Sequence, residues 1–239
     1  MIFNGHNTCI KNKTFRFIFN NFYISAGQAN NQKYARSLYK HIWTFDDGHI
    51  DQLKQIYYDY FKPEGLVFQF FICPKLIDEW EIGNSEYVRS QLRDPNAELL
   101  SWDQIGNLID AGNIIGSHGI DHESFSGMSC NMMSEQLESS KEMIKKRTGI
   151  TPNTFAFPYG YVSPSSIEAS RAARKEYLEV HLSDNNLPIG EIENGIFNRR
   201  HSEFGICVIK GLFIGALDVI LGINVGRLRN RKLNIWLVK

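Results

Sequence analysis

Thr44-Phe45-Asp46-Asp47-Gly48 is the stretch that decides the fold of this 239-residue chain. Residues 42–45 are apolar or β-branched, as expected for a buried strand, and two adjacent carboxylates and a glycine follow them. Two neighbouring carboxylates repel each other, and burying either one costs free energy unless a cation or a hydrogen-bond donor compensates. The stretch therefore indicates a strand that ends at a functional site.

A second polar cluster, Ser117-His118-Gly119-Ile120-Asp121-His122, lies further along the chain. The four-residue spacing of its two histidines lets both imidazoles converge on one ion from a helical turn or a tight loop. Two neutral imidazoles and one carboxylate form a donor set for a catalytic zinc ion, which keeps coordination positions open. Asp46 or Asp47 can supply the carboxylate, and the other acid can then accept a proton as general base. Alone, such a histidine pair also arises by chance, and Asp-Asp-Gly is a common turn.

Segments with strand and helix patterns alternate along the chain, which favours an α/β fold with a parallel sheet or an incomplete (β/α) barrel. Apolar runs predict strands at residues 39–45, 66–73, 113–116, 155–157, 177–182 and 195–200. Helical spacing of apolar residues predicts helices at residues 50–61, 101–111 and 133–147. Ser163 followed by Pro164 resembles an N-cap with proline at the first helical position and predicts a helix at residues 163–176. Both polar clusters follow predicted strands, so we expect them at the same end of the sheet.

Local signals refine this pattern. Ser101 is an N-cap candidate and forms a capping-box pattern with Gln104, while Gly112 marks the end of that helix. Residues 78–97 are polar and mixed, and we expect an excursion with one short helix at most. Residues 184–194 are expected to form a loop.

Composition fits one domain over residues 1–239, with a motif core at 40–205 and an apolar and basic segment at 206–239 that packs on the core or extends it. Lys+Arg and Asp+Glu number 26 each, and a net charge of zero argues against a nucleic-acid partner. The four cysteines form no CxxC pair, so they are expected to be reduced.

Residues 1–20 lack the continuous apolar region of a secretory signal. The most apolar tract, residues 211–225, is short and interrupted by Asp218 and Asn224, so no transmembrane span is expected. We expect residues 211–225 to form a core helix. The alternative is peripheral contact with a membrane surface, because basic residues follow at 227–232. The sequence therefore predicts a cytoplasmic protein, with association at the cytoplasmic face of the membrane as the alternative. It leaves the oligomeric state open.

Three separated motifs resemble those of the polysaccharide deacetylases of the NodB-homology class, carbohydrate esterase family 4. The first motif is Thr44–Gly48, the second is Ile115–His118 with His122, and the third is Phe155-Ala156-Phe157-Pro158-Tyr159-Gly160. The connecting helix, Leu100–Ile105 with Ala111-Gly112, also agrees, and the match covers residues 42–160 in the family's order. The resemblance implies a distorted, incomplete (β/α) barrel. It also implies metal-dependent hydrolysis of an N-linked or O-linked acetyl group on a sugar.

Through this resemblance, Asp46 is similar to the general base, and Asp47, His118 and His122 are similar to the metal ligands. Zinc is the expected ion, with Co²⁺, Ni²⁺ and Mn²⁺ as alternatives. Tyr159 resembles the residue whose backbone N–H holds the oxyanion, a role that such donors fill well.

Further residues are expected around these groups. Ser117 and Asp121 are candidates to orient the imidazoles. His49, directly after the acid motif, and Pro158, directly before Tyr159, are candidates to lie near the substrate.

The chain departs from the family pattern at three places. Many members carry an arginine where this chain has Ala156, and Arg199 or Arg200 is a candidate to replace it beside Asp46. The Leu-x-His motif of the general acid is absent, which leaves His181 and His201 as candidates. The Asp-Trp motif that lines the acetyl pocket is also missing after residue 160.

The resulting prediction is a hydrolase acting on carbon–nitrogen bonds other than peptide bonds. It would remove an acetyl group, N-linked in the first instance, from a carbohydrate such as a precursor of a surface polysaccharide. One alternative is a catalytically inactive carbohydrate-binding member of the same fold. Another is a deformylase or cyclic-imide hydrolase on the same scaffold.

Overall fold

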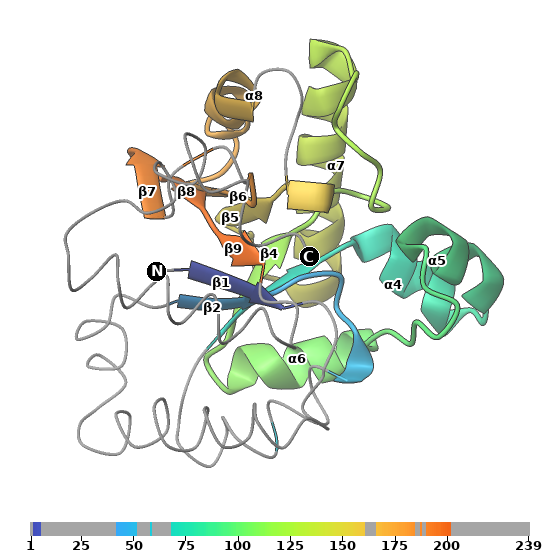
Figure 1. Cartoon of the computed structure of the whole chain (residues 1–239). Coiled ribbons are helices and arrows are strands. Elements are labelled where there is room, and N and C mark those ends of the chain that lie inside the picture. The colour runs from blue at the N-terminus through green and yellow to red at the C-terminus, as the bar shows by residue number, and fades with distance from the viewer. Residues whose placement is uncertain are drawn as a thin grey trace, which may run out of the picture.

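The computed structural model of the chain describes residues 2–5, 42–51, 58, 68–160, 166–184, 187 and 190–201. In this part of the chain nine strands form one sheet, in the order β7-β8-β6-β5-β4-β3-β2-β1-β9 (Figure 1). The strands are β1 (Ile2–Gly5), β2 (Ile42–Phe45), β3 (Gln69–Ile72), β4 (Ile114–Ser117), β5 (Thr154–Ala156), β6 (Glu179–Leu182), β7 (Gly190–Glu193), β8 (Ile196–Asn198) and β9 (Arg200–His201).

Neighbouring strands run parallel, except that β7 runs antiparallel to β8. The carboxyl ends of the central strands therefore open on one side of the sheet, where parallel α/β folds carry their sites. With its flanking helices the sheet forms the distorted, incomplete (β/α) barrel that the sequence predicted.

Five α-helices are described, namely α4 (Pro74–Glu81), α5 (Ser85–Leu92), α6 (Trp102–Asp110), α7 (Cys130–Thr148) and α8 (Ser166–Ala173). Helices α6 and α7 pack against β4, α8 packs against β6, and α4 packs against α5 (Figure 1). No helix among the described residues is both long enough and apolar enough to cross a membrane.

The strands alternate between an outer face that meets the helices and an inner face that lines the barrel. On the outer face, Phe70 and Ile115 pack with Leu108 of α6 in a fully buried apolar cluster. On the inner face Gly116 allows the strands to approach closely, because an added Cβ would lie 2.4 Å from Thr154 Oγ1 and 2.6 Å from the Phe71 ring. The predicted strands are present with shifted bounds, and the inner face is more polar than their apolar runs suggest.

Two local predictions are wrong. Residues 78–97 contain more than one short helix, because the second half of α4 and the whole of α5 lie within them. They are stable because Leu76 and Val88 are buried in a separate small core with Cys73.

Residues 184–194 are not all loop, since β7 forms a hairpin with β8 through Asn194-Gly195. Gly195 has a φ of +75°. Asn-Gly is the dipeptide that favours such tight turns, so this signal was present in the sequence.

Other predictions are confirmed. Ser101 and Gln104 form both bonds of the capping box at the start of α6. Cys73 and Cys130 are free thiols. The expected helix at 50–61 lies mostly outside the described residues. The helix start at Ser163, Cys9, Cys207 and the whole of 206–239, with the 211–225 and 227–232 stretches, also lie outside them.

Candidate active site

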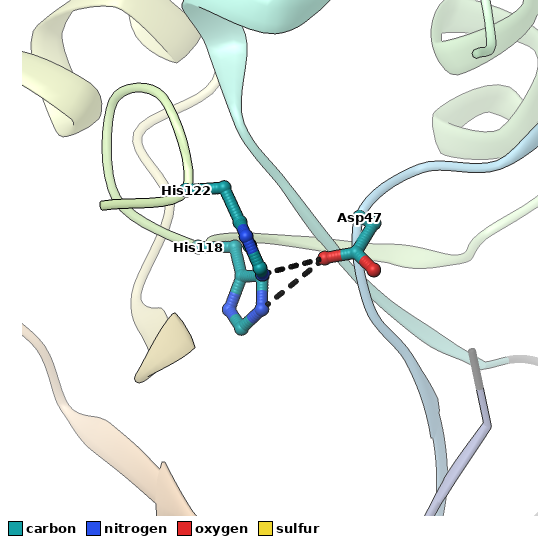
Figure 2. A group of neighbouring side chains, drawn as sticks. All are labelled: Asp47, His118 and His122. Carbon is teal, nitrogen blue, oxygen red and sulfur yellow. Dashed lines mark ion pairs between the residues drawn. The ribbon is translucent and has the colours of Figure 1, made fainter. Parts of the chain in front are cut away.

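Asp47, His118 and His122 converge in a buried cluster beyond the carboxyl ends of β2 and β4 (Figure 2). The Oδ1 atom of Asp47 lies 3.2 Å from His122 Nε2 and 3.4 Å from His118 Nε2. One ligand atom from each residue lies within 4.8 Å of the others. The structure thus brings together all three residues that the sequence assigned to a metal.

The local backbone turns these side chains toward one another. His118 directly follows β4, whereas Asp47 and His122 adopt left-handed conformations with φ of 70° and 62°. Such a conformation costs a non-glycine residue about 1–2 kcal/mol. Backbone strain of this kind is concentrated at functional sites, where the surrounding structure sustains it.

The imidazole of His118 is oriented by a backbone atom. Its Nδ1 lies 2.7 Å from the Ala156 carbonyl oxygen, which can only accept, so Nδ1 carries the proton and Nε2 presents its lone pair. Burial lowers the pKa of His118 to about 4, against the opposing effect of Asp46 and Asp47. The ring is therefore neutral at pH 7, which is the form that binds a metal.

The donor set fits a divalent metal. Among the described residues, His118 Nε2 and His122 Nδ1 are buried ring nitrogens without a hydrogen-bond partner. A buried polar atom without a partner costs free energy, and a cation held by the two imidazoles and the carboxylate would compensate for that cost at His118 Nε2. Two imidazoles and one carboxylate are also the three protein ligands of many catalytic zinc sites.

Asp46 has a different partner from Asp47. The guanidinium of Arg199, between β8 and β9, donates to both Asp46 oxygens at 2.7 and 2.9 Å and to Thr44 Oγ1 at 2.9 Å. Arg199 is almost fully buried and lies over the Phe71 ring at 5.1 Å. A buried bidentate pair of this kind stabilises the carboxylate form of the acid. Arg199 thus occupies the place beside Asp46 that Ala156 leaves open.

The third motif completes the rim of the cluster. Tyr159 lies in the short 3₁₀ segment Pro158–Gly160 with a φ of 60°, and its half-buried ring is 4.6 Å from the ring of His122. Pro158 is buried directly before it. The ring of Tyr159 is thereby placed next to a proposed metal ligand.

The residues expected to orient the imidazoles instead hold the surrounding loop. Ser117 Oγ contacts Ser140 Oγ of α7 at 2.7 Å and accepts from the Gly119 N–H. Asp121 Oδ2 pairs with Lys75 Nζ at 3.0 Å. Neither side chain bonds to an imidazole within the described part of the chain. The orienting group, the Ala156 carbonyl, was missed because a backbone acceptor leaves no signal in the sequence.

His49 lies beside the cluster, with Nε2 3.6 Å from Asp47 Oδ2, and its backbone bridges to Leu99. It is buried, so it contacts the metal carboxylate rather than lying at the surface.

The two candidates for the general acid lie on β6 and β9. His181 on β6 is fully buried between the rings of Phe71 and Phe197, with Nε2 3.5 Å from Glu179 Oε2. Burial lowers its pKa, which disfavours the protonated form that an acid needs. His201 belongs to β9 at the edge of the sheet, and its side chain lies outside the described ones. Both assignments stay predictions.

Fold and site together place the protein among the deacetylase-type α/β-barrel hydrolases. The chain belongs to the polysaccharide deacetylase family, whose model matches residues 39–178, more than half of the sequence. It is thus a hydrolase acting on carbon–nitrogen bonds other than peptide bonds.

Several solved structures share the fold. IcaB from Ammonifex degensii is 16% identical, with 84% of this chain and 91% of that chain covered and a TM-score of 0.58. The Streptococcus pyogenes deacetylase PplD, in complex with acetate, is 14% identical over 84% and 90% of the two chains, with a TM-score of 0.59. A de-N-acetylase from Aggregatibacter actinomycetemcomitans is 16% identical over 88% and 97%, with a TM-score of 0.56. No curated protein matches the sequence significantly.

Proposed function

We propose that the protein removes an N-linked acetyl group from a carbohydrate at a divalent metal held by Asp47, His118 and His122. One observation carries the proposal: in a chain of the polysaccharide deacetylase family, these three side chains are buried together next to a second, separately paired acid. Zinc is the ion we propose, because the two imidazoles and one carboxylate suit it best. When bound, such an ion lowers the pKa of a coordinated water and polarises the acyl carbonyl.

Asp46 is the proposed general base. Its Oδ2 lies 3.7 Å from His118 Nε2, so the carboxylate borders the cluster without being needed as a ligand. Arg199 fixes the plane of this carboxylate through two hydrogen bonds, and the carboxylate is proposed to accept a proton from the attacking water. The two adjacent acids thus have separate tasks.

The remaining groups act on the acyl oxygen and the leaving amine. The backbone N–H of Tyr159 is proposed to donate to the oxyanion, since its motif lies against His122. The leaving amine needs a proton donor, for which His181 and His201 remain the candidates. A cytoplasmic sugar precursor as substrate, and one domain spanning residues 1–239, also remain predictions.

Acetate release from N-acetylated chito-oligosaccharides by the zinc-loaded protein tests the proposal. Wild type should release acetate, and Asp46→Asn should lower the rate by at least about a hundredfold, because a general base contributes that much. Calorimetry should show unchanged oligosaccharide binding by Asp46→Asn. The matched control is Asp110→Asn, which removes an exposed carboxylate on α6 and should keep full activity.

Several results would contradict the proposal. Equal acetate release by wild type and Asp46→Asn would exclude Asp46 as the base. Binding of the sugar without release of any acetate would instead favour the inactive carbohydrate-binding alternative, whereas release of formate or opening of a cyclic imide would favour the third class.

A further inference from the structure

Four residues other than glycine adopt left-handed backbone conformations in the described part of the chain, namely Asp47, Arg93, His122 and Tyr159. Two of them are proposed metal ligands, and Tyr159 contacts one of these ligands. Arg93 is the fourth, and it comes from a distant element, the end of α5. Strained residues gather at functional sites, so the position of Arg93 relative to the other three is informative.

Arg93 contacts the same aromatic ring that contacts the metal cluster. Its guanidinium carbon lies 5.1 Å from the centre of the Tyr159 ring, within the range of a cation–π interaction. The centre of the Tyr159 ring is in turn 4.6 Å from that of the His122 ring. One tyrosine ring therefore separates a positive charge from a residue of the proposed metal site.

The backbone at this position does not require arginine. Arg93 ends α5 with a φ of 54°, its N–H donates to the Ser90 carbonyl, and the next N–H donates to the Arg89 carbonyl. Glycine or asparagine usually occupies such a left-handed helix end, since glycine carries no steric penalty there. The arginine side chain is thus kept at a backbone cost, and helix termination does not account for it.

The charge of Arg93 is available to a ligand. Its side chain is exposed, and within the described residues its guanidinium forms no ion pair. Neighbouring cations are engaged, since Lys75 pairs with Asp121, and Arg89 donates to the Ala97 carbonyl and lies over Trp80. A guanidinium recognises phosphate or carboxylate groups through paired hydrogen bonds.

We propose that Arg93, held on the Tyr159 ring, binds an anionic substituent of the carbohydrate, a phosphate or a carboxylate, next to the sugar that is deacetylated. The enzyme then prefers anionic over neutral acetylated sugars. This inference rests on the proposed function and adds the substrate class to it.

The test compares kcat/KM of the zinc-loaded full chain for neutral N-acetylglucosamine, N-acetylglucosamine 6-phosphate and N-acetylmuramic acid. Wild type should prefer at least one anionic sugar by about tenfold or more, and which one shows whether phosphate or carboxylate is recognised. Arg93→Gly should remove this preference and leave kcat/KM for the neutral sugar unchanged. Glycine suits the left-handed backbone, so the Tm of this variant should be equal or higher.

Lys146→Gln is the matched control, because it removes an exposed positive charge in the last turn of α7 and should leave the preference intact. Absence of a preference in wild type, its persistence in Arg93→Gly, or an equal loss for all three sugars would overturn the inference. Acetate release would still support the proposed function in each of these cases.

Binding separates the two proposals if no sugar is hydrolysed. Calorimetry then compares Asp46→Asn with Asp46→Asn/Arg93→Gly for the same three sugars. A selective loss of affinity for an anionic sugar supports the role of Arg93 although the proposed function has failed. Equal affinities in the two variants overturn it.

Discussion

Asp46 and Asp47 are neighbours in the sequence, yet their carboxylates have different partners. Asp46 is paired on both oxygens with Arg199, while Asp47 faces the imidazoles of His118 and His122. Arg199 thus compensates the charge of Asp46, and the proposed metal ion would compensate that of Asp47, which would offset the repulsion expected of two buried adjacent acids. The pair makes physical sense as one proton acceptor and one metal ligand.

Single residues of the site differ in how well sequence predicts them. His118 and His122 could be found from their spacing after a predicted strand, and the resemblance to the family singled out Asp47 from the acid pair. Arg199 lies 153 residues from Asp46, so only the folded chain shows that it pairs with that acid. The contact that Arg93 makes with Tyr159 had no signal at all, since a tertiary contact between two turns leaves no periodicity.

Removal of Arg199 should leave a buried charge without compensation. We expect Arg199→Met to lower the free energy of unfolding by about 3–5 kcal/mol, as measured by urea denaturation. The matched exposed pair is Arg171 with Glu193. The guanidinium of Arg171 also contacts both carboxylate oxygens of Glu193. Solvent screens that pair, so Arg171→Met should barely change stability.

The double variant Asp46→Asn/Arg199→Met isolates the cause. Because it removes both charges, it should recover much of the stability that Arg199→Met loses. If Arg199→Met and Arg171→Met lowered the free energy of unfolding by the same small amount, the pair of Arg199 with Asp46 would not be a buried interaction.

At the scale of elements, prediction succeeded where the sequence carries capping signals and failed where burial decides. The capping-box pattern of Ser101 and Gln104 identified the start of α6. The sequences of helices α4 and α5 are mostly polar, because each helix buries only a narrow apolar stripe against a small separate core. Strand β1 was missed, because its partner strands β2 and β9 are distant in sequence.

Two glycines test how closely the strands approach inside the barrel. Gly116→Ala places a Cβ against Thr154 and Phe71, so it should cost about 1–3 kcal/mol through overpacking. Gly106 in α6 has nothing within 4 Å of the same added atom. Gly106→Ala should therefore raise stability by roughly 0.5–1 kcal/mol, through helix propensity.

Thermal unfolding of both glycine variants checks this pair. Opposite signs of the change in Tm would support the close approach of β3, β4 and β5. A neutral or stabilising Gly116→Ala would contradict the packing of the inner face.

At the scale of the whole molecule, the site depends on the order of the strands. Asp47 follows β2 and His118 follows β4, and β3 lies between them, so a parallel register brings both to one end of the barrel. Arg199 reaches the same place from β8–β9. Alternating strands and helices predicted this class of fold, but the position of β1 beside β9 required the tertiary structure.

The central claim is that the cluster of Asp47, His118 and His122 holds the ion on which hydrolysis depends. The most direct measurement is acetate release by chelator-treated protein titrated with Zn²⁺. We expect wild type to release no acetate before the metal is added and to reach full release at one equivalent of Zn²⁺ per chain. Addition of Zn²⁺ should not restore acetate release in His118→Ala. Full acetate release by the metal-free protein would contradict the account.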